Sequence, residues 1–201
     1  MYLSRVYVQW PKSKNAYTLH QSLWELFPNR PNEKRDFLFR VEQEKTGVGV
    51  SVLMQSQQEP ALDIESVELK AKRDYSLDLH EGQCLRFLLK ANPVKTIKDE
   101  KGRKNSKGEV RKCRVPLIKE EEQLQWLKQK LDGIAILKEI QISPCLPLYF
   151  LKQGRAGKVV PLKFEGLVTV ADPVAFSALL ENGVGPAKSL GCGMLSLAPA
   201  G

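Results

Sequence analysis

The sequence has few residues that could hold a metal ion and no segment that could cross a membrane. Its 201 residues include only four cysteines and two histidines, and no two cysteines have the Cys-x-x-Cys spacing of zinc sites. The longest apolar runs, such as residues 148–151, fall far short of the roughly 18 residues that span a bilayer. Residues 1–10 alternate like a strand and lack the apolar centre of a signal peptide. We therefore expect a cytoplasmic protein with no metal site and no membrane attachment.

The motifs of nucleotide-dependent enzymes are also missing. The glycine-rich stretch GPAKSLGCG at 185–193 comes nearest, but Ala187 stands where a P-loop requires glycine before Lys188 and Ser189. The dinucleotide fingerprint fails too, because residue 196 is serine and a strand is predicted to follow rather than a helix. We therefore expect no cofactor.

The glycines of this stretch still have a physical meaning. Glycine readily adopts a positive φ, and successive backbone N–H groups can then converge on an anion. The predicted phosphate clamp consists of Gly185, Lys188, Ser189, Gly191 and Gly193. An ordinary tight connection between a helix and an edge strand fits the same composition, so both interpretations stay open.

The net charge of +8 is concentrated in one part of the chain. Residues 86–114 carry eleven Lys or Arg against three acidic residues, and hence the whole excess. One basic segment in an otherwise balanced protein favours a localised polyanionic partner, with a solvated charged loop as the alternative. Because 92–116 is too polar for a core element, we expect a long mobile loop there. Its candidate polyanion-binding residues are Lys95, Lys98, Lys101, Arg103, Lys104, Lys107, Arg111, Lys112 and Arg114.

The apolar pattern predicts two units with the same order of elements. The first has strands at 2–9, 35–43, 48–56 and 67–75, a helix at 15–27 that begins at the N-cap Asn15, and a short polar helix near 61–66. The second has strands at 83–91, 134–143, 147–151 and 158–170, a last strand MLSLA, and helices at 119–131 and 172–183, the latter with Asp172 as N-cap and Pro173 next.

A βαββαβ order is typical of a ferredoxin-like sheet. We therefore predict an α+β fold with two tandem ferredoxin-like (RRM-like) domains, 1–80 and 84–201. The second domain would contain the basic loop 92–116 and the glycine-rich loop 185–193. No residue-level repeat supports the second unit, so a single larger α+β domain is the alternative.

Tyr17 and His20 are the most suggestive polar pair outside these loops. Their spacing of three places both side chains on one face of the predicted first helix. Histidine is suited to proton transfer near neutral pH, and tyrosine could bind a phosphate oxygen or stack on a base. A structural role is the common alternative for such a pair. The other histidine, His80, lies in a polar turn and is expected on the surface.

Several stretches, in the same order along nearly the whole chain, resemble the CasE family, the CRISPR-associated endoribonucleases of type I-E Cascade. The matching stretches are MYLSRV, YTLHQ with LWELFPNRP, RDFLFRVE, LRFLLKANPVKTI, KGEVRKCRVPLIKEEEQLQWLKQKL, FEGLVTV and GVGPAKSLGCGMLSLAP.

The resemblance implies both a fold and an activity. It implies two ferredoxin-like domains and metal-independent cleavage of the CRISPR transcript (pre-crRNA) at the base of each repeat hairpin. It also implies that the protein stays on the mature crRNA beside other Cascade subunits. His20 and Tyr17 would be the catalytic pair, and the loop 185–193 would hold the RNA. Some members carry a lysine late in the first helix; none lies between Lys14 and Arg30 here, so Lys188 or a residue of 92–114 would have to supply that cation.

Two other functions remain as alternatives. The first is an RNA-binding scaffold subunit without turnover, which the pair of Tyr17 and His20 disfavours. The second is a duplex-DNA-binding domain, which is disfavoured because no helix-turn-helix or zinc module is apparent in the sequence.

Overall fold

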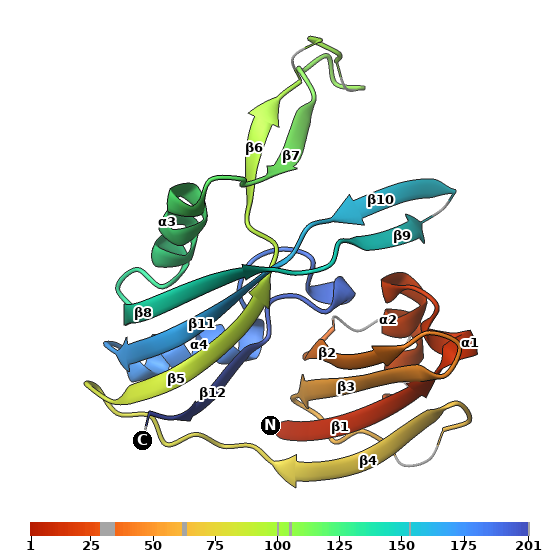
Figure 1. The fold of residues 1–201 in the computed structure, drawn as a ribbon, viewed down its shortest axis with the longest axis vertical. Helices are drawn as coiled ribbons and strands as arrows, with labels where there is room; N and C mark the ends of the chain where they lie inside the picture. The colour runs from red at the N-terminus through yellow and green to blue at the C-terminus, as the bar shows by residue number, and fades with distance from the viewer. Residues whose placement is uncertain (29–34, 62–63, 100, 105, 153, 201) are drawn as a thin grey trace.

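The structure is a computed structural model that describes residues 1–28, 35–61, 64–99, 101–104, 106–152 and 154–200. The first half of the chain forms a four-stranded antiparallel sheet in the order β2-β3-β1-β4. Its elements are β1 (Tyr2–Gln9), α1 (Trp10–Ser13), α2 (Ala16–Trp24), β2 (Phe37–Lys45), β3 (Gly49–Ser56) and β4 (Val67–Asp74). The four strands have the ferredoxin-like order, and Figure 1 shows them in red to yellow.

The second half forms another four-stranded antiparallel sheet, in the order β12-β5-β11-β8. The elements of this sheet and its helices are β5 (Cys84–Ala91), α3 (Glu120–Lys130), β8 (Ala135–Pro144), β11 (Leu162–Val170), α4 (Pro173–Asn182), the 3-10 turn η1 (Lys188–Leu190) and β12 (Leu195–Pro199). Again the order is ferredoxin-like. The N-cap predicted at Asp172 is confirmed, since its Oδ1 accepts hydrogen bonds from the N–H groups of Val174 and Ala175.

Each sheet has its own hydrophobic core, as two separate domains require. In the first, Leu19 and Leu23 of α2 pack with Val6, Val8 and the buried side chains of β2 and β3. In the second, Leu127 of α3 and Phe176 of α4 pack on β5 and β11. The alternative of a single larger domain is therefore wrong, because it would bury one continuous core.

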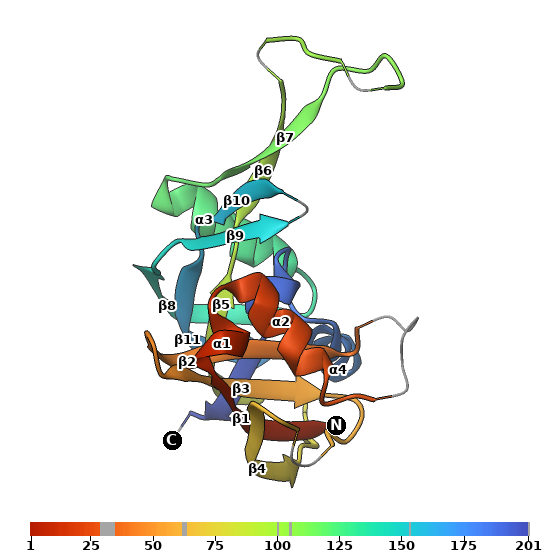
Figure 2. The same ribbon diagram turned by 90° about the vertical axis from the view of Figure 1, so that its right-hand side faces the viewer.

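Two short hairpins are added to the second unit. β6 (Val94–Lys98) pairs with β7 (Lys112–Pro116), and β9 (Leu148–Lys152) pairs with β10 (Arg155–Val159). Figures 1 and 2 show β6 and β7 projecting away from both sheets.

Three sequence expectations need correction. The segment 92–116 is not a structureless loop, because its polarity excludes burial but not strand pairing between β6 and β7. The strand expected at 158–170 is divided into β10 and β11, separated by the buried Pro161, which cannot donate to a ladder. The helix expected near 61–66 is not formed where this range is described: Ile64 bridges Val67, and 65–66 form a turn. Residues 62–63 lie outside the described residues.

Specific contacts join the two halves. The Gln55 side chain of β3 donates a hydrogen bond of 2.9 Å to the carbonyl oxygen of Leu180 in α4. The buried Arg40 of β2 donates through Nη1 to Ser196 Oγ of β12 at 2.7 Å. These contacts hold the last helix and strand against the first sheet, so that η1 contacts both α2 and β2.

Candidate active site

A capping box sets where α2 begins. Asn15 Oδ1 accepts hydrogen bonds from the N–H groups of Tyr17 (2.9 Å) and Thr18 (3.0 Å), and Thr18 Oγ1 accepts one from the N–H of Asn15 (3.2 Å). This confirms the predicted N-cap. With the first turn fixed and Leu19 buried in the core, Tyr17 and His20 lie one turn apart on the helix and both are half-buried.

Aromatic side chains hold the His20 ring. Its centroid lies 5.7 Å from that of Phe37 and 6.3 Å from that of Phe39, whose ring is nearly parallel to it at 24°. Trp24, one turn later on α2, meets it edge-on at 6.4 Å. Because these neighbours are rigid and largely buried, the imidazole has a fixed position at the end of the first core.

The glycine-rich loop is held by its own backbone. Ala187 has the left-handed values φ 65° and ψ 27°, and its carbonyl oxygen accepts from Leu190 N–H at 2.9 Å, which forms η1. At the other end, Gly193 N–H donates to the Lys90 carbonyl at 2.7 Å, and Val184 N–H donates to the Gly193 carbonyl at 2.8 Å. These bonds join the loop to β5 and close it upon itself.

The loop and α2 face each other across one pocket of about 630 Å³. The pocket therefore combines residues from both halves of the chain. Its lining residues are His20, Trp24, Arg35, Arg114, Gly185, Pro186, Ala187, Lys188 and Ser189.

The pocket is positively charged. Arg35, Arg114 and Lys188 line it, and neither Asp nor Glu is found among its lining residues where the chain is described. Burial lowers the pKa of Lys188, and the nearby charges of Arg35 and Lys130 lower it further. The Lys188 Nζ donates to the carbonyl oxygen of Asn182, at the end of α4, at 2.5 Å. Such an arrangement favours binding of an anion, because like charges gathered without a counterion destabilise one another.

Of the predicted clamp, the structure brings Gly185, Lys188 and Ser189 to the pocket with His20. Gly191 and Gly193 do not line it. Their φ angles, 81° and 90°, favour glycine, and the absence of a side chain allows close packing: a Cβ on Gly191 would lie 3.2 Å from Phe39, and one on Gly193 would lie 2.8 Å from the Val184 carbonyl.

The pocket also contains residues that the sequence did not single out. Tyr17 is not among its lining residues, although it is one turn from His20 on α2. Arg35 and Trp24 line it unexpectedly. Arg35 precedes β2 and opens the stretch RDFLFRVE, but that stretch assigned the arginine no role. The pairing of β2 with β3 and the contact of β2 with η1 explain its place. Lys188 and Arg114, which belong to the two places considered for a substitute of the missing helix lysine, both line the pocket.

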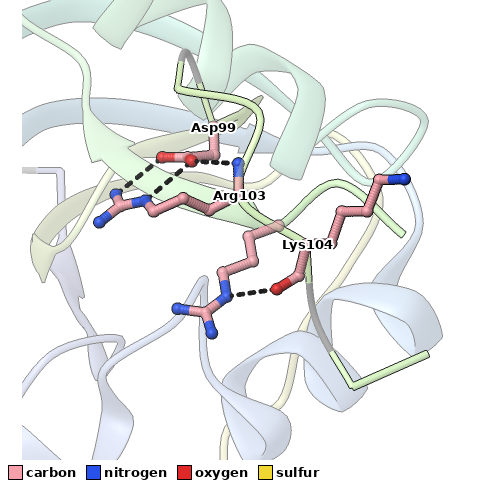
Figure 3. A network of polar contacts seen from close by, with 4 residues as sticks. Asp99, Arg103 and Lys104 are labelled. Carbon is pink, nitrogen blue, oxygen red and sulfur yellow. Dashed lines mark hydrogen bonds and ion pairs between the residues drawn. The ribbon is translucent and has the colours of Figure 1, made fainter. Parts of the chain in front are cut away.

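The remaining basic residues follow the β6–β7 hairpin away from the pocket. Figure 3 shows Arg103 bound to both Asp99 carboxylate oxygens, through Nη2 at 2.8 Å and Nε at 2.9 Å. This pairing lowers the pKa of Asp99 to about 2. Arg111 Nε donates to the Lys104 carbonyl at 3.0 Å, and Lys95 forms an ion pair with Glu122 of α3. Lys98, Lys101, Lys107 and Lys112 are exposed along the hairpin.

No group of three or more His, Cys, Asp or Glu is placed to hold a metal ion in the ranges that the structure describes. In those same ranges, no helix is long and apolar enough to cross a membrane.

The model of a family of CRISPR-associated proteins matches residues 1–199. The chain belongs to this family. The Cascade subunit CasE of Escherichia coli K12 is 47% identical to it over 199 residues, which is 99% of this chain and all of the relative. The CRISPR-associated endoribonuclease Cse3 of Thermus thermophilus is 32% identical over 202 residues, which cover 92% of this chain and 90% of the relative.

Solved structures of CRISPR-associated proteins have the same architecture. The crystal structure of Cas6e from E. coli K-12 superimposes with a TM-score of 0.87 at 44% identity, covering 99% of this chain and 100% of that one. Cse3 bound to a 19-nucleotide RNA superimposes with a TM-score of 0.75 at 31% identity and the same coverage. The tandem ferredoxin-like fold predicted from the sequence is confirmed.

Proposed function

We propose that this CRISPR-associated protein is an endoribonuclease that cleaves CRISPR repeat hairpins in pre-crRNA without a metal ion and stays bound to the mature crRNA as a Cascade subunit. Its relatives are named an endoribonuclease and a Cascade subunit. One observation carries the assignment of the site: His20 of the first domain faces Lys188, Ser189 and the glycine-loop backbone of the second across one cationic pocket. Because the substrate is a transcript, we expect the protein to act in the cytoplasm.

RNA supplies its own nucleophile, the 2′-OH beside each phosphate. Its oxygen attacks the phosphorus, the bond from phosphorus to O5′ breaks, and the products are a 2′,3′-cyclic phosphate and a 5′-OH. The 2′-OH loses a proton and the leaving O5′ gains one, so the reaction needs one well-placed group for one of these transfers, water for the other, and a stabilised phosphorane. The pocket offers a histidine for the first task and cations with backbone N–H groups for the second.

The residues divide these tasks between the domains. His20, held by aromatic rings, transfers the proton, and Tyr17 lies one turn away on α2, where its hydroxyl contacts the RNA strand beside the cut. Gly185, Lys188 and Ser189 hold the phosphate backbone from the opposite side. Gly191 and Gly193 support this clamp by allowing the loop to pack against the first domain and upon itself.

The β6–β7 hairpin binds the stem of the repeat. The deep major groove of A-form RNA hides its base edges, so recognition rests mainly on shape and on phosphates. A projecting ribbon with a chain of exposed cations is suited to follow such a backbone. Arg114, at the pocket end of this ribbon, connects stem binding to the site of cleavage.

The test is cleavage of a labelled cognate repeat hairpin in excess EDTA, beside a substrate with a single 2′-deoxynucleotide at the cut site. We expect cutting in EDTA that disappears with the deoxy substrate. Inhibition by EDTA would contradict the metal-free mechanism. Tight binding of the hairpin with no cleavage would identify a scaffold subunit, and equal competition by duplex DNA would contradict RNA specificity.

A further inference from the structure

Arg35 is a partly buried cation of the pocket with an unused hydrogen-bond donor among the described residues. It precedes β2 and lines the pocket together with His20 and Lys188. Its Nε is buried, and no residue in the described part of the chain accepts a hydrogen bond from it. A guanidinium can only donate, and a buried donor without an acceptor costs stability. A phosphate oxygen would satisfy it after a small movement of the side chain, because Arg35 as a whole is only partly buried.

The surrounding charge points to the same kind of ligand. Burial lowers the pKa of Arg35, and its charge in turn contributes to the lowered pKa of Lys188. Two cations are thus held close together in a partly desolvated pocket, where the described lining residues offer no carboxylate. The repulsion between them is relieved when a phosphate enters.

The other two cations are less suited to the reacting group. Lys188 already donates from Nζ to the Asn182 carbonyl at 2.5 Å. Arg114 is exposed on β7, at the root of the hairpin. Arg35 alone combines burial, a place beside His20 and an unused donor among the described residues.

We propose that Arg35 binds the non-bridging oxygens of the scissile phosphate and stabilises the negative charge that they gain in the phosphorane. This proposal rests on the proposed function. The planar fork of Arg35 holds two phosphate oxygens at once, while His20 makes one of the two proton transfers and water makes the other. Arg35 keeps its own protons throughout: the bond from O2′ to phosphorus forms, the bond from phosphorus to O5′ breaks, and the only proton movements are from the 2′-OH and to O5′.

The first experiment compares Arg35→Gln and Arg35→Lys with the wild-type protein in single-turnover cleavage of a repeat hairpin in EDTA. Arg73→Gln is the control, because Arg73 is an exposed arginine of β4 that lies over the ring of Tyr75, away from the pocket. We expect Arg35→Gln to lower the cleavage rate about 100-fold. Arg35→Lys should cut about tenfold faster than Arg35→Gln, and Arg73→Gln should cut at the wild-type rate. Affinity for the 2′-deoxy hairpin should fall only a few-fold, which also shows that the variants fold.

The second experiment replaces one non-bridging oxygen of the scissile phosphate by sulfur, with the two diastereomers tested separately. The wild-type protein should cut one diastereomer more slowly than the other, and Arg35→Gln should lose this discrimination. A role of Arg35 in folding alone would lower the rate and leave the discrimination intact, and would overturn the proposal.

The outcomes separate this proposal from the function itself. If the wild-type protein cuts in EDTA and Arg35→Gln cuts as fast, only the role of Arg35 is wrong. If Arg35→Gln lowers the affinity for the deoxy hairpin by the same factor as the cleavage rate of the normal hairpin, Arg35 serves ground-state binding and the proposal is overturned. If the wild-type protein does not cut, the proposed function is wrong and the role of Arg35 with it.

Discussion

The ring of Phe39 lies against the backbone of Gly191, so close that a Cβ on Gly191 would be 3.2 Å from the ring. The same ring is stacked on His20. Phe39 thus sets the position of the histidine from the first domain and of the loop that faces it from the second. The separation of the two sides of the pocket depends on this shared contact.

Gly191→Ala should therefore lower both stability and cleavage. Its φ of 81° costs an alanine about 1 kcal/mol, and the added methyl must displace Phe39 or the loop, for a total loss of about 2 kcal/mol. Gly82→Ala is the matched control, because Gly82 has a φ of 78° and a Cβ there would have no neighbour within 4 Å. Urea unfolding and hairpin cleavage measure both effects. Equal loss of stability in the two variants, with cleavage unchanged, would contradict the role of the contact.

His20→Ala should lower single-turnover cleavage by about 100-fold or more, since general acid–base catalysis typically contributes that much. Affinity for the 2′-deoxy hairpin should be retained. His80→Ala is the control: His80 is exposed, with Nε2 3.4 Å from an Asp78 carboxylate oxygen, and its loss should leave cleavage unchanged. A His20→Ala protein that binds and cuts like the wild type would remove His20 from the mechanism.

Lys188→Met should have an effect on stability that depends on pH. In the folded protein the pKa of Lys188 is lowered from its ordinary value of 10.5. At pH values between the pKa of the folded chain and that of the unfolded chain, the unfolded chain therefore binds more protons than the folded one. Wild-type stability therefore gains as pH rises through this window, and the methionine variant lacks that gain. Relative to the wild type, the variant should lose stability between pH 7.5 and pH 10.

Urea unfolding midpoints at the two pH values measure this difference. Lys128→Met, at an exposed lysine of α3, controls for the loss of one charge. If the stability of Lys188→Met relative to the wild type stays constant or increases with pH, the pKa of Lys188 is not lowered in the folded protein.

Two adjacent cations of the hairpin should contribute unequally to RNA binding. Arg103 is bound to Asp99 through two side-chain hydrogen bonds, whereas the exposed Lys104 offers its charge to solvent. Lys104→Gln should reduce the slope of log affinity against log salt by about 0.7 to 0.9, and Arg103→Gln by much less. In an Asp99→Asn background, Arg103→Gln should reduce this slope by more than it does in the wild-type background. Equal slopes for the two single variants would show that Arg103 leaves Asp99 to bind phosphate.

Much of the fold could be predicted because the signals are local. The N-caps Asn15 and Asp172 were correctly placed, since capping depends on neighbours within three residues. The β6–β7 hairpin was not found, because exposed polar strands lack the apolar alternation that reveals a half-buried strand. The predicted helix near 61–66 failed where it is described because a short polar segment has neither packing nor length to stabilise helical turns.

By itself, the sequence indicated the element order of two ferredoxin-like units and the family, because each depends on local pattern or on motif, and it predicted that a histidine-bearing helix and a glycine-rich loop serve one RNA site. Only the tertiary structure decided which residues meet. The packing of β2 against η1 brought Arg35 to the pocket. Within one glycine-rich loop, it left Gly185 lining the pocket and placed Gly191 against Phe39. Contacts between residues more than 150 positions apart, such as Arg40 with Ser196, fix the spacing across the pocket. Such contacts leave no periodic signal in a single sequence.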